Sequence, residues 1–164
     1  MKEIWSFSPS RQLVQRCRAQ ADLCGSRPEQ RRHTVAMKDD FNFDGACGEA
    51  FFGAFIGQHD PPCWGPRPDP GWDFETRAGT VDVKATRSRT PSLMVGTDGG
   101  KRKLQADIFV LVQLVGERPD GKLVGWATKA DVEAAPVFSH LKREPHVISS
   151  GRLRPISTLM EMIR

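Results

Sequence analysis

An unbroken apolar run, Ile108-Phe109-Val110-Leu111-Val112, limits the folds open to this chain more than any other segment. A strand with one face in water alternates apolar and polar residues, whereas a strand covered on both faces is apolar throughout. We therefore predict a central strand over about residues 104–115. Because both faces of such a strand must be covered, the run favours a layered α/β fold around a mixed sheet.

Other segments supply elements to cover this strand. Three segments carry helix signals. Ser8-Pro9-Ser10 can cap a first helix, and Asp44 is a candidate cap for a second helix with apolar residues at 51, 52, 55 and 56. Pro155 precedes the apolar stripe of a closing helix. A strand at 123–127 should pair with the central strand through the turn Pro119-Asp120-Gly121. The expected helices are about 10–24, 44–57 and 155–163, shorter strands are expected at 93–95 and 146–148, and residues 29–40 are expected to be a loop or short strand.

Length and composition bound the classes of protein. A chain of 164 residues has the size of a single domain, which we assign to residues 1–164. Lysine and arginine number 24 against 20 acidic residues, and this formal charge of +4 suits a polyanionic partner. No stretch approaches the roughly 18 apolar residues of a membrane span, and Met1-Lys2-Glu3-Ile4 does not open a signal peptide. We expect a soluble, cytoplasmic protein without a membrane partner.

The four cysteines lie at positions 17, 24, 47 and 63. None of them forms a Cys-x-x-Cys pair, and His59 with Cys63 matches only half of a zinc motif. The spacing therefore argues against a structural zinc site. We expect free thiols in a reducing compartment.

Chemistry-bearing residues concentrate in the segment 71–86, which predicts two short strands joined by a turn at Ala78-Gly79. Side chains alternate along a strand, so Asp82 and Lys84 point the same way while Val81 and Val83 point the other way. The turn brings Asp73 alongside them. Two carboxylates and an ammonium at one place can hold a divalent cation and a phosphate, although a solvated surface hairpin would show the same alternation.

This segment resembles the PD-(D/E)XK nuclease superfamily, which has the restriction-endonuclease-like or Holliday-junction-resolvase-like fold. Val81-Asp82-Val83-Lys84 matches its acid-x-lysine strand, and Asp73 matches the acid that opens the hairpin. The literal Pro-Asp of the motif lies upstream at Pro68-Asp69, so Asp69 is the alternative first acid. The resemblance covers about residues 43–127. It implies a magnesium-dependent deoxyribonuclease, with manganese able to substitute and an endonuclease expected over an exonuclease.

Members of this superfamily often add a glutamate from the helix before the hairpin, and Glu49 matches that position. The resemblance implies that Asp73, Asp82 and Glu49 hold magnesium, while Lys84 orients the attacking water and stabilises the transition state. A glutamate in the first turn of a helix is also favoured by the helix dipole, which is the alternative explanation of Glu49. The resemblance further implies homodimers, since superfamily members commonly dimerise to cut both strands.

Two basic clusters follow the motif and are candidate phosphate contacts: Arg87 with Arg89, and Lys101-Arg102-Lys103. Charge runs are commonly solvated surface, so these assignments depend on their closeness to the predicted metal site. The residues leave DNA against RNA open, as well as duplex against junction or single strand. The alternatives to a nuclease are a non-catalytic nucleic-acid-binding module and a structural or partner-binding protein in which the charged hairpin is only surface.

Overall fold

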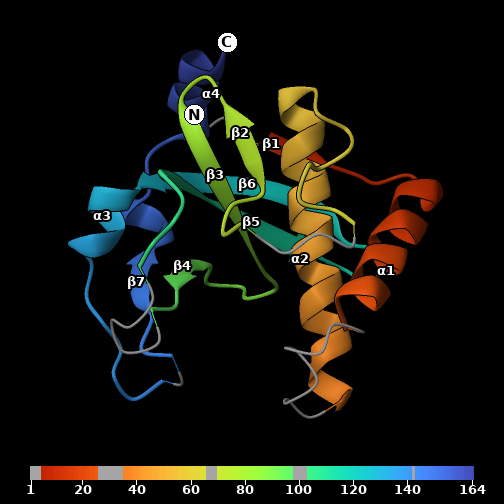
Figure 1. Cartoon of the computed structure of the whole chain (residues 1–164), viewed down its shortest axis with the longest axis horizontal. Coiled ribbons are helices and arrows are strands. Elements are labelled where there is room, and N and C mark those ends of the chain that lie inside the picture. Colours follow the sequence, from red (N-terminus) through yellow and green to blue (C-terminus); the bar gives the residue numbers. More distant parts are fainter. Residues whose placement is uncertain (1–4, 26–34, 66–69, 98–102, 142) are drawn as a thin grey trace.

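The computed structural model describes residues 5–25, 35–65, 70–97, 103–141 and 143–164 (Figure 1). Its core is a five-stranded mixed sheet with the strand order β1-β6-β5-β3-β2. A two-stranded antiparallel ribbon of β4 and β7 lies beside it. The strands are β1 (Trp5–Phe7), β2 (Phe74–Thr76), β3 (Gly79–Thr86), β4 (Ser92–Val95), β5 (Ile108–Val115), β6 (Asp120–Thr128) and β7 (His146–Ser149). The helices are α1 (Arg11–Gly25), α2 (Val35–Ile56), α3 (Lys129–Glu133) and α4 (Ile156–Ile163).

The predicted central strand is confirmed as β5, which begins four residues later than the apolar pattern suggested. It pairs in parallel with β3 and antiparallel with β6. Val110 and Val112 contribute to one apolar core, and Phe109 and Leu111 contribute to a second core on the opposite face. All four side chains are almost completely buried, as expected for a strand covered on both faces.

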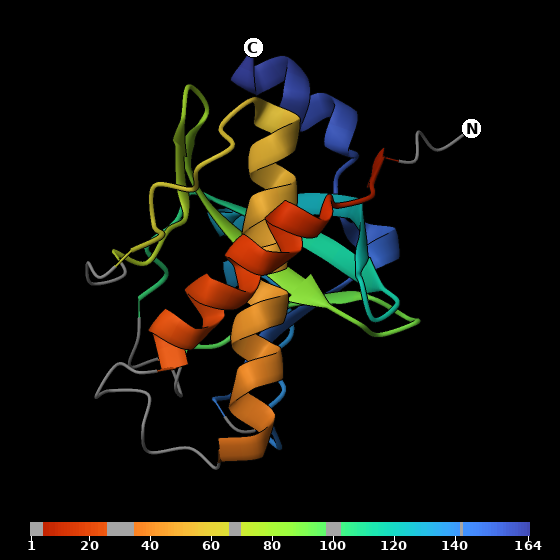
Figure 2. The ribbon, with the colours of Figure 1, turned by 90° about the vertical axis from the view of Figure 1, so that its right-hand side faces the viewer.

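Helices α1 and α2 cover one face of the sheet. Helix α2 lies against the sheet, and α1 crosses it on the outer side (Figure 2). Phe43, Cys47, Phe51 and Phe52 of α2 are buried, as a helix between two layers requires. The opposite face is covered by α3 and the β4–β7 ribbon (Figure 1), with Val132 and Leu93 fully buried. The α/β class and a mixed sheet flanked by helices are therefore confirmed, while the restriction-endonuclease-like fold stays a prediction.

Several element boundaries differ from the sequence prediction. Helix α2 begins at Val35, so Asp44 lies inside the helix and is not its cap. The Asp44 side chain instead forms an ion pair with Arg87 at 2.8 Å. Residues 35–40, expected as loop or strand, are helical, whereas 29–34 lie outside the described residues. The turn before β6 covers residues 116–119 and not Pro119-Asp120-Gly121, because β6 already begins at Asp120. Gly116 in this turn adopts a φ of 87°, which residues with a side chain rarely adopt.

Other local predictions are confirmed. The Ser10 hydroxyl accepts a hydrogen bond from the Leu13 N–H at 3.1 Å, which is the expected cap of α1. Strands β4, β6 and β7 and the closing helix α4 lie where the patterns placed them. Strand β1 was not predicted, because a three-residue edge strand carries little periodicity. Within the described residues, no helix combines the length and apolar character needed to cross a bilayer.

Candidate active site

The hairpin that carries the candidate motif is present, with its turn at Arg77-Ala78 instead of Ala78-Gly79. Phe74 pairs with Val81 and Thr76 with Gly79, so β2 and β3 form an antiparallel ladder. Val81 and Val83 are buried in the core beneath the helices. Asp82 and Lys84 therefore share the opposite side of β3, where Lys84 Nζ lies 2.7 Å from a carboxylate oxygen of Asp82.

Asp73 is fixed at the edge of β3, directly before β2 begins. Its backbone N–H donates to the Val81 carbonyl at 2.8 Å and extends the ladder by one bond. Its side-chain Oδ2 accepts the Val83 N–H at 2.7 Å. The Asp73 carboxylate thus accepts a backbone hydrogen bond of β3 that a neighbouring strand would otherwise accept, next to the end of the β2–β3 ladder. Only 9% of Asp73 is exposed, so this charged group is almost completely buried.

Glu49 reaches the same edge from α2. The preceding Gly48 allows the helix to approach β3, because a Cβ there would lie 2.9 Å from the Ala85 Cβ. The Glu49 carboxylate accepts a hydrogen bond from Trp64 Nε1 at 2.6 Å and one from the Cys63 thiol at 3.5 Å, both on Oε2. Helix α2 and the loop after it therefore position this side chain together.

The loop that carries Cys63 and Trp64 is held by α1. The Arg16 guanidinium lies 5.6 Å from the centre of a Trp64 ring and also forms an ion pair with Asp60. The Gly65 N–H donates to Gln20 Oε1 at 3.2 Å. These contacts fix the loop over Glu49 in a defined position.

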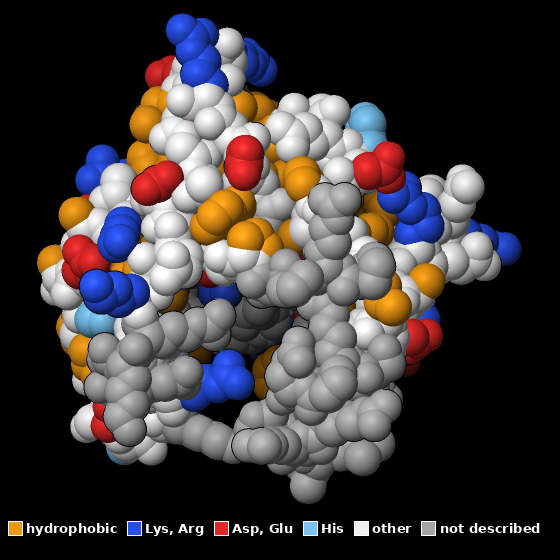
Figure 3. Space-filling view, in the orientation of Figure 1, with side chains coloured by type: hydrophobic (Ala, Val, Ile, Leu, Met, Phe, Trp, Pro, Cys, Tyr) orange, Lys and Arg blue, Asp and Glu red, His pale blue; other side chains and the backbone are white. Residues whose placement is uncertain are grey.

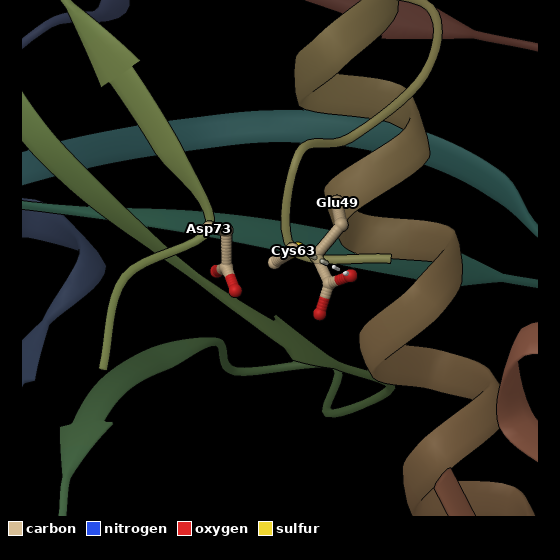
Figure 4. Close-up of side chains that lie close together, drawn as sticks. All are labelled: Glu49, Cys63 and Asp73. Carbon is tan, nitrogen blue, oxygen red and sulfur yellow. Dashed lines mark hydrogen bonds between the residues drawn. The ribbon is translucent and has the colours of Figure 1, made fainter. Parts of the chain in front are cut away.

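A cavity of about 60 Å³ opens beside these groups. This volume accommodates several water molecules or a hydrated cation, since one water needs roughly 10–15 Å³ on the same measure. Asn42 Nδ2 is buried there and has no hydrogen-bond partner within the described residues. Glu49, Cys63 and Asp73 point toward one another (Figure 4), and one donor atom from each lies within 4.8 Å of the others. The lining residues are Gln20, Cys24, Asn42, Ala46, Glu49, Cys63 and Asp73.

The electrostatics of the four predicted site residues are strongly linked. Burial raises the pKa of Glu49 to about 7, against an ordinary value of 4.5. Burial, followed by the nearby charges of Glu49 and Asp82, raises the pKa of Asp73 well above its usual range. Burial alone would lower the pKa of Lys84, but the paired Asp82 carboxylate, with the charges of Asp73 and Glu49, raises it above its ordinary value. The surroundings therefore disfavour the ionised forms of Glu49 and Asp73, which a nearby cation would favour.

The four predicted catalytic residues, Glu49, Asp73, Asp82 and Lys84, interact electrostatically with one another. Donor atoms of Glu49 and Asp73 lie within 4.8 Å of each other, whereas Asp82 is not in this group of donors and is paired with Lys84. The alternative first acid, Asp69, lies outside the described residues. Cys63 and Trp64 were not predicted as members of the site. They follow two prolines in an irregular connection, and no periodicity or motif spacing there pointed to Glu49.

The predicted phosphate contacts have different environments. Arg87 is bound by Asp44 and by the Gly116 carbonyl, which gives it a structural role whether or not it meets a ligand. Arg89 and Lys103 are exposed. Lys101 and Arg102 lie outside the described residues. Figure 3 shows Lys and Arg side chains at several places on this face, including near its centre.

Comparison with models of protein families, with curated proteins and with solved structures found no match for this chain.

Proposed function

We propose that this protein is a magnesium-dependent nuclease that hydrolyses phosphodiester bonds of DNA. The observation that carries the proposal is the convergence of Glu49, Asp73 and the Asp82–Lys84 pair at one edge of β3. These residues come from a helix, a loop and a strand, and the charges of each influence the others. The PD-(D/E)XK resemblance rests on the same residues, and the hairpin geometry that it implied is present.

The donor set suits magnesium. Glu49 and Asp73 offer carboxylate oxygens, which hard cations prefer. Of the residues that the structure describes, none forms an ion pair with either carboxylate, and Lys84 is paired with Asp82. Burying an unpaired charge is costly, so a divalent cation bound there would relieve the repulsion between the acids. Manganese has similar ligand preferences and should substitute.

When bound, the metal would neutralise charge on the scissile phosphate and lower the pKa of a water. The residues of the chain have separate parts in this scheme. Glu49, Asp73 and Asp82 would hold the cation. Lys84 would orient the attacking water and stabilise negative charge on the pentavalent transition state through its ammonium group. Trp64 is a positioning residue, because its indole N–H fixes the Glu49 carboxylate.

Several features support a nucleic acid as the substrate. The formal charge of +4 favours a polyanion. Arg89 and Lys103 are exposed and available to phosphates, and basic side chains lie near the centre of the face in Figure 3. The choice of DNA over RNA, endonuclease action and a homodimer that cuts both strands follow from the resemblance. Product analysis and the mass of the protein in solution test these points.

The decisive experiment is cleavage of supercoiled plasmid with and without magnesium or manganese. We expect Asp73→Asn, Asp82→Asn and Lys84→Met each to abolish cleavage while the circular dichroism spectrum is unchanged. Asp120→Asn, an exposed carboxylate at the start of β6, is the matched control and should cut normally. Wild-type cleavage by the Asp82 variant would refute the assignment. Retention on DNA without any metal-dependent cleavage would favour the non-catalytic binding module.

A further inference from the structure

The sulfur atom in the candidate site has no place in the magnesium proposal. Magnesium takes oxygen ligands, whereas Cys63 Sγ lies 3.5 Å from Glu49 Oε2, and one donor atom each of Glu49, Cys63 and Asp73 lies within 4.8 Å of the other two. We propose that Glu49, Cys63 and Asp73 also bind a thiophilic divalent cation such as Zn²⁺.

The distance between the donor atoms of Cys63 and Glu49 fits such an ion. Zinc binds sulfur at about 2.3 Å and carboxylate oxygen at about 2.0–2.2 Å in tetrahedral geometry, which places sulfur and oxygen ligands roughly 3.5–3.7 Å apart. The separation of Cys63 Sγ from Glu49 Oε2 is already 3.5 Å. The carboxylate oxygen of Asp73 that lies within 4.8 Å of these two atoms would be the third ligand, with water in the fourth position.

The surroundings hold these ligands in place as a metal site requires. Trp64 donates to the Glu49 carboxylate, and the Val83 N–H donates to the Asp73 carboxylate. Supporting hydrogen bonds of this kind orient metal ligands and contribute to affinity. The two carboxylates are in no ion pair among the described residues, so the buried charge favours a cation. The adjoining cavity of about 60 Å³ gives room for the ion and its water.

Binding would convert the Cys63 thiol into a metal-bound thiolate, with the proton released to solvent and no change of oxidation state. Zinc and magnesium would share Glu49 and Asp73, so one ion excludes the other. Sulfur ligation favours zinc over magnesium at equal concentration. The site would therefore bind a thiophilic metal in preference to magnesium, and this preference does not depend on nuclease activity.

Cobalt and zinc titration of the purified protein tests this without nucleic acid, so its outcome does not depend on nuclease activity. Co²⁺ should produce a sulfur-to-cobalt charge-transfer band in the near ultraviolet, which Zn²⁺ then displaces. Cys63→Ser should remove the band and weaken zinc binding at least tenfold by calorimetry. Cys24→Ser is the matched control, because Cys24 lines the same cavity but is not one of the three clustered donors.

The result that overturns the proposal is the absence of a charge-transfer band in the wild-type protein, or zinc binding by the Cys63 variant with wild-type affinity. Cys63→Ala provides a second test in case serine oxygen replaces the sulfur as a ligand. Thermal unfolding without metal verifies that both variants are folded. A band that persists in both Cys63 variants and disappears in Cys24→Ser would show that Cys24, and not Cys63, binds the metal. This result would refute the proposed site.

Discussion

Glu49→Gln should stabilise the metal-free protein at alkaline pH and leave it almost unchanged at acid pH. The folded-state pKa of Glu49 is raised to about 7 from an ordinary value of 4.5, because burial disfavours its ionised form. Between these values the folded protein binds more protons than the unfolded chain. Its free energy of unfolding therefore falls as the pH rises from about 4.5 to 7.

The size of the effect follows from this difference. At about 1.4 kcal/mol per pH unit, the rise from 4.5 to about 7 is worth about 3 kcal/mol, and access of water to the cavity reduces this to about 2 kcal/mol. Glutamine keeps an oxygen that can accept the Trp64 hydrogen bond but carries no charge. The variant should melt roughly 4–8 °C higher than wild type at pH 8. At pH 4 the two proteins should melt together.

Thermal unfolding from pH 4 to 8 in the presence of a chelator measures the difference. Glu75→Gln, an exposed carboxylate on β2, is the control and should follow wild type throughout. Added magnesium should then raise the melting temperature of wild type more than that of Glu49→Gln, by the linkage of binding to folding. Parallel pH profiles for wild type and Glu49→Gln would refute the view that Glu49 is a destabilising buried charge.

Three further predictions follow from other contacts. Arg154 and the helix cap hold the pKa of Asp131 below its usual range. Asp131→Asn should therefore lower the free energy of unfolding, measured in urea at pH 7, by about 1 kcal/mol. This difference from wild type should vanish as the pH falls below 3.8. Arg89→Ala should reduce the slope of log affinity for duplex DNA against log salt concentration by about 0.9. Arg87→Ala should instead lower the melting temperature, because Arg87 forms an ion pair with Asp44. Gly48→Val should cost about 1–3 kcal/mol by separating α2 from β3, and should diminish the magnesium-dependent rise in melting temperature.

The central strand of the fold was predictable because a buried strand has a recognisable pattern of apolar residues. A strand covered on both faces must be apolar, and the run at 108–112 could form little else than β5. The alternation of Val81, Asp82, Val83 and Lys84 likewise fixed which side chains face the core and which face outward. In both cases the cause is local, since adjacent side chains on a strand point to opposite faces.

The first half of α2 was not predictable in the same way. Asn42 and Asp44 give the segment a loop-like polar pattern, because the groups beside them in the fold are distant in sequence. Asp44 pairs with Arg87, and Asn42 lines the cavity beside Gln20. These polar residues interrupt the apolar pattern on the helix, so the hydrophobic period that defines a surface helix is lost. The prediction of a cap at Asp44 was wrong for this reason.

The candidate site shows where spacing rules stop being informative. Motif spacing can find candidate site residues on one element, such as Asp82 and Lys84, or on a short hairpin, such as Asp73. Cys63 joins Glu49 from 14 residues away, through a loop whose position depends on the stacking of Arg16 on Trp64. A rule based on cysteine pairs could not find a site with one sulfur and two carboxylates. The sulfur beside the carboxylates is what distinguishes the proposed zinc site from a magnesium site, and the sequence pattern gave no sign of this sulfur.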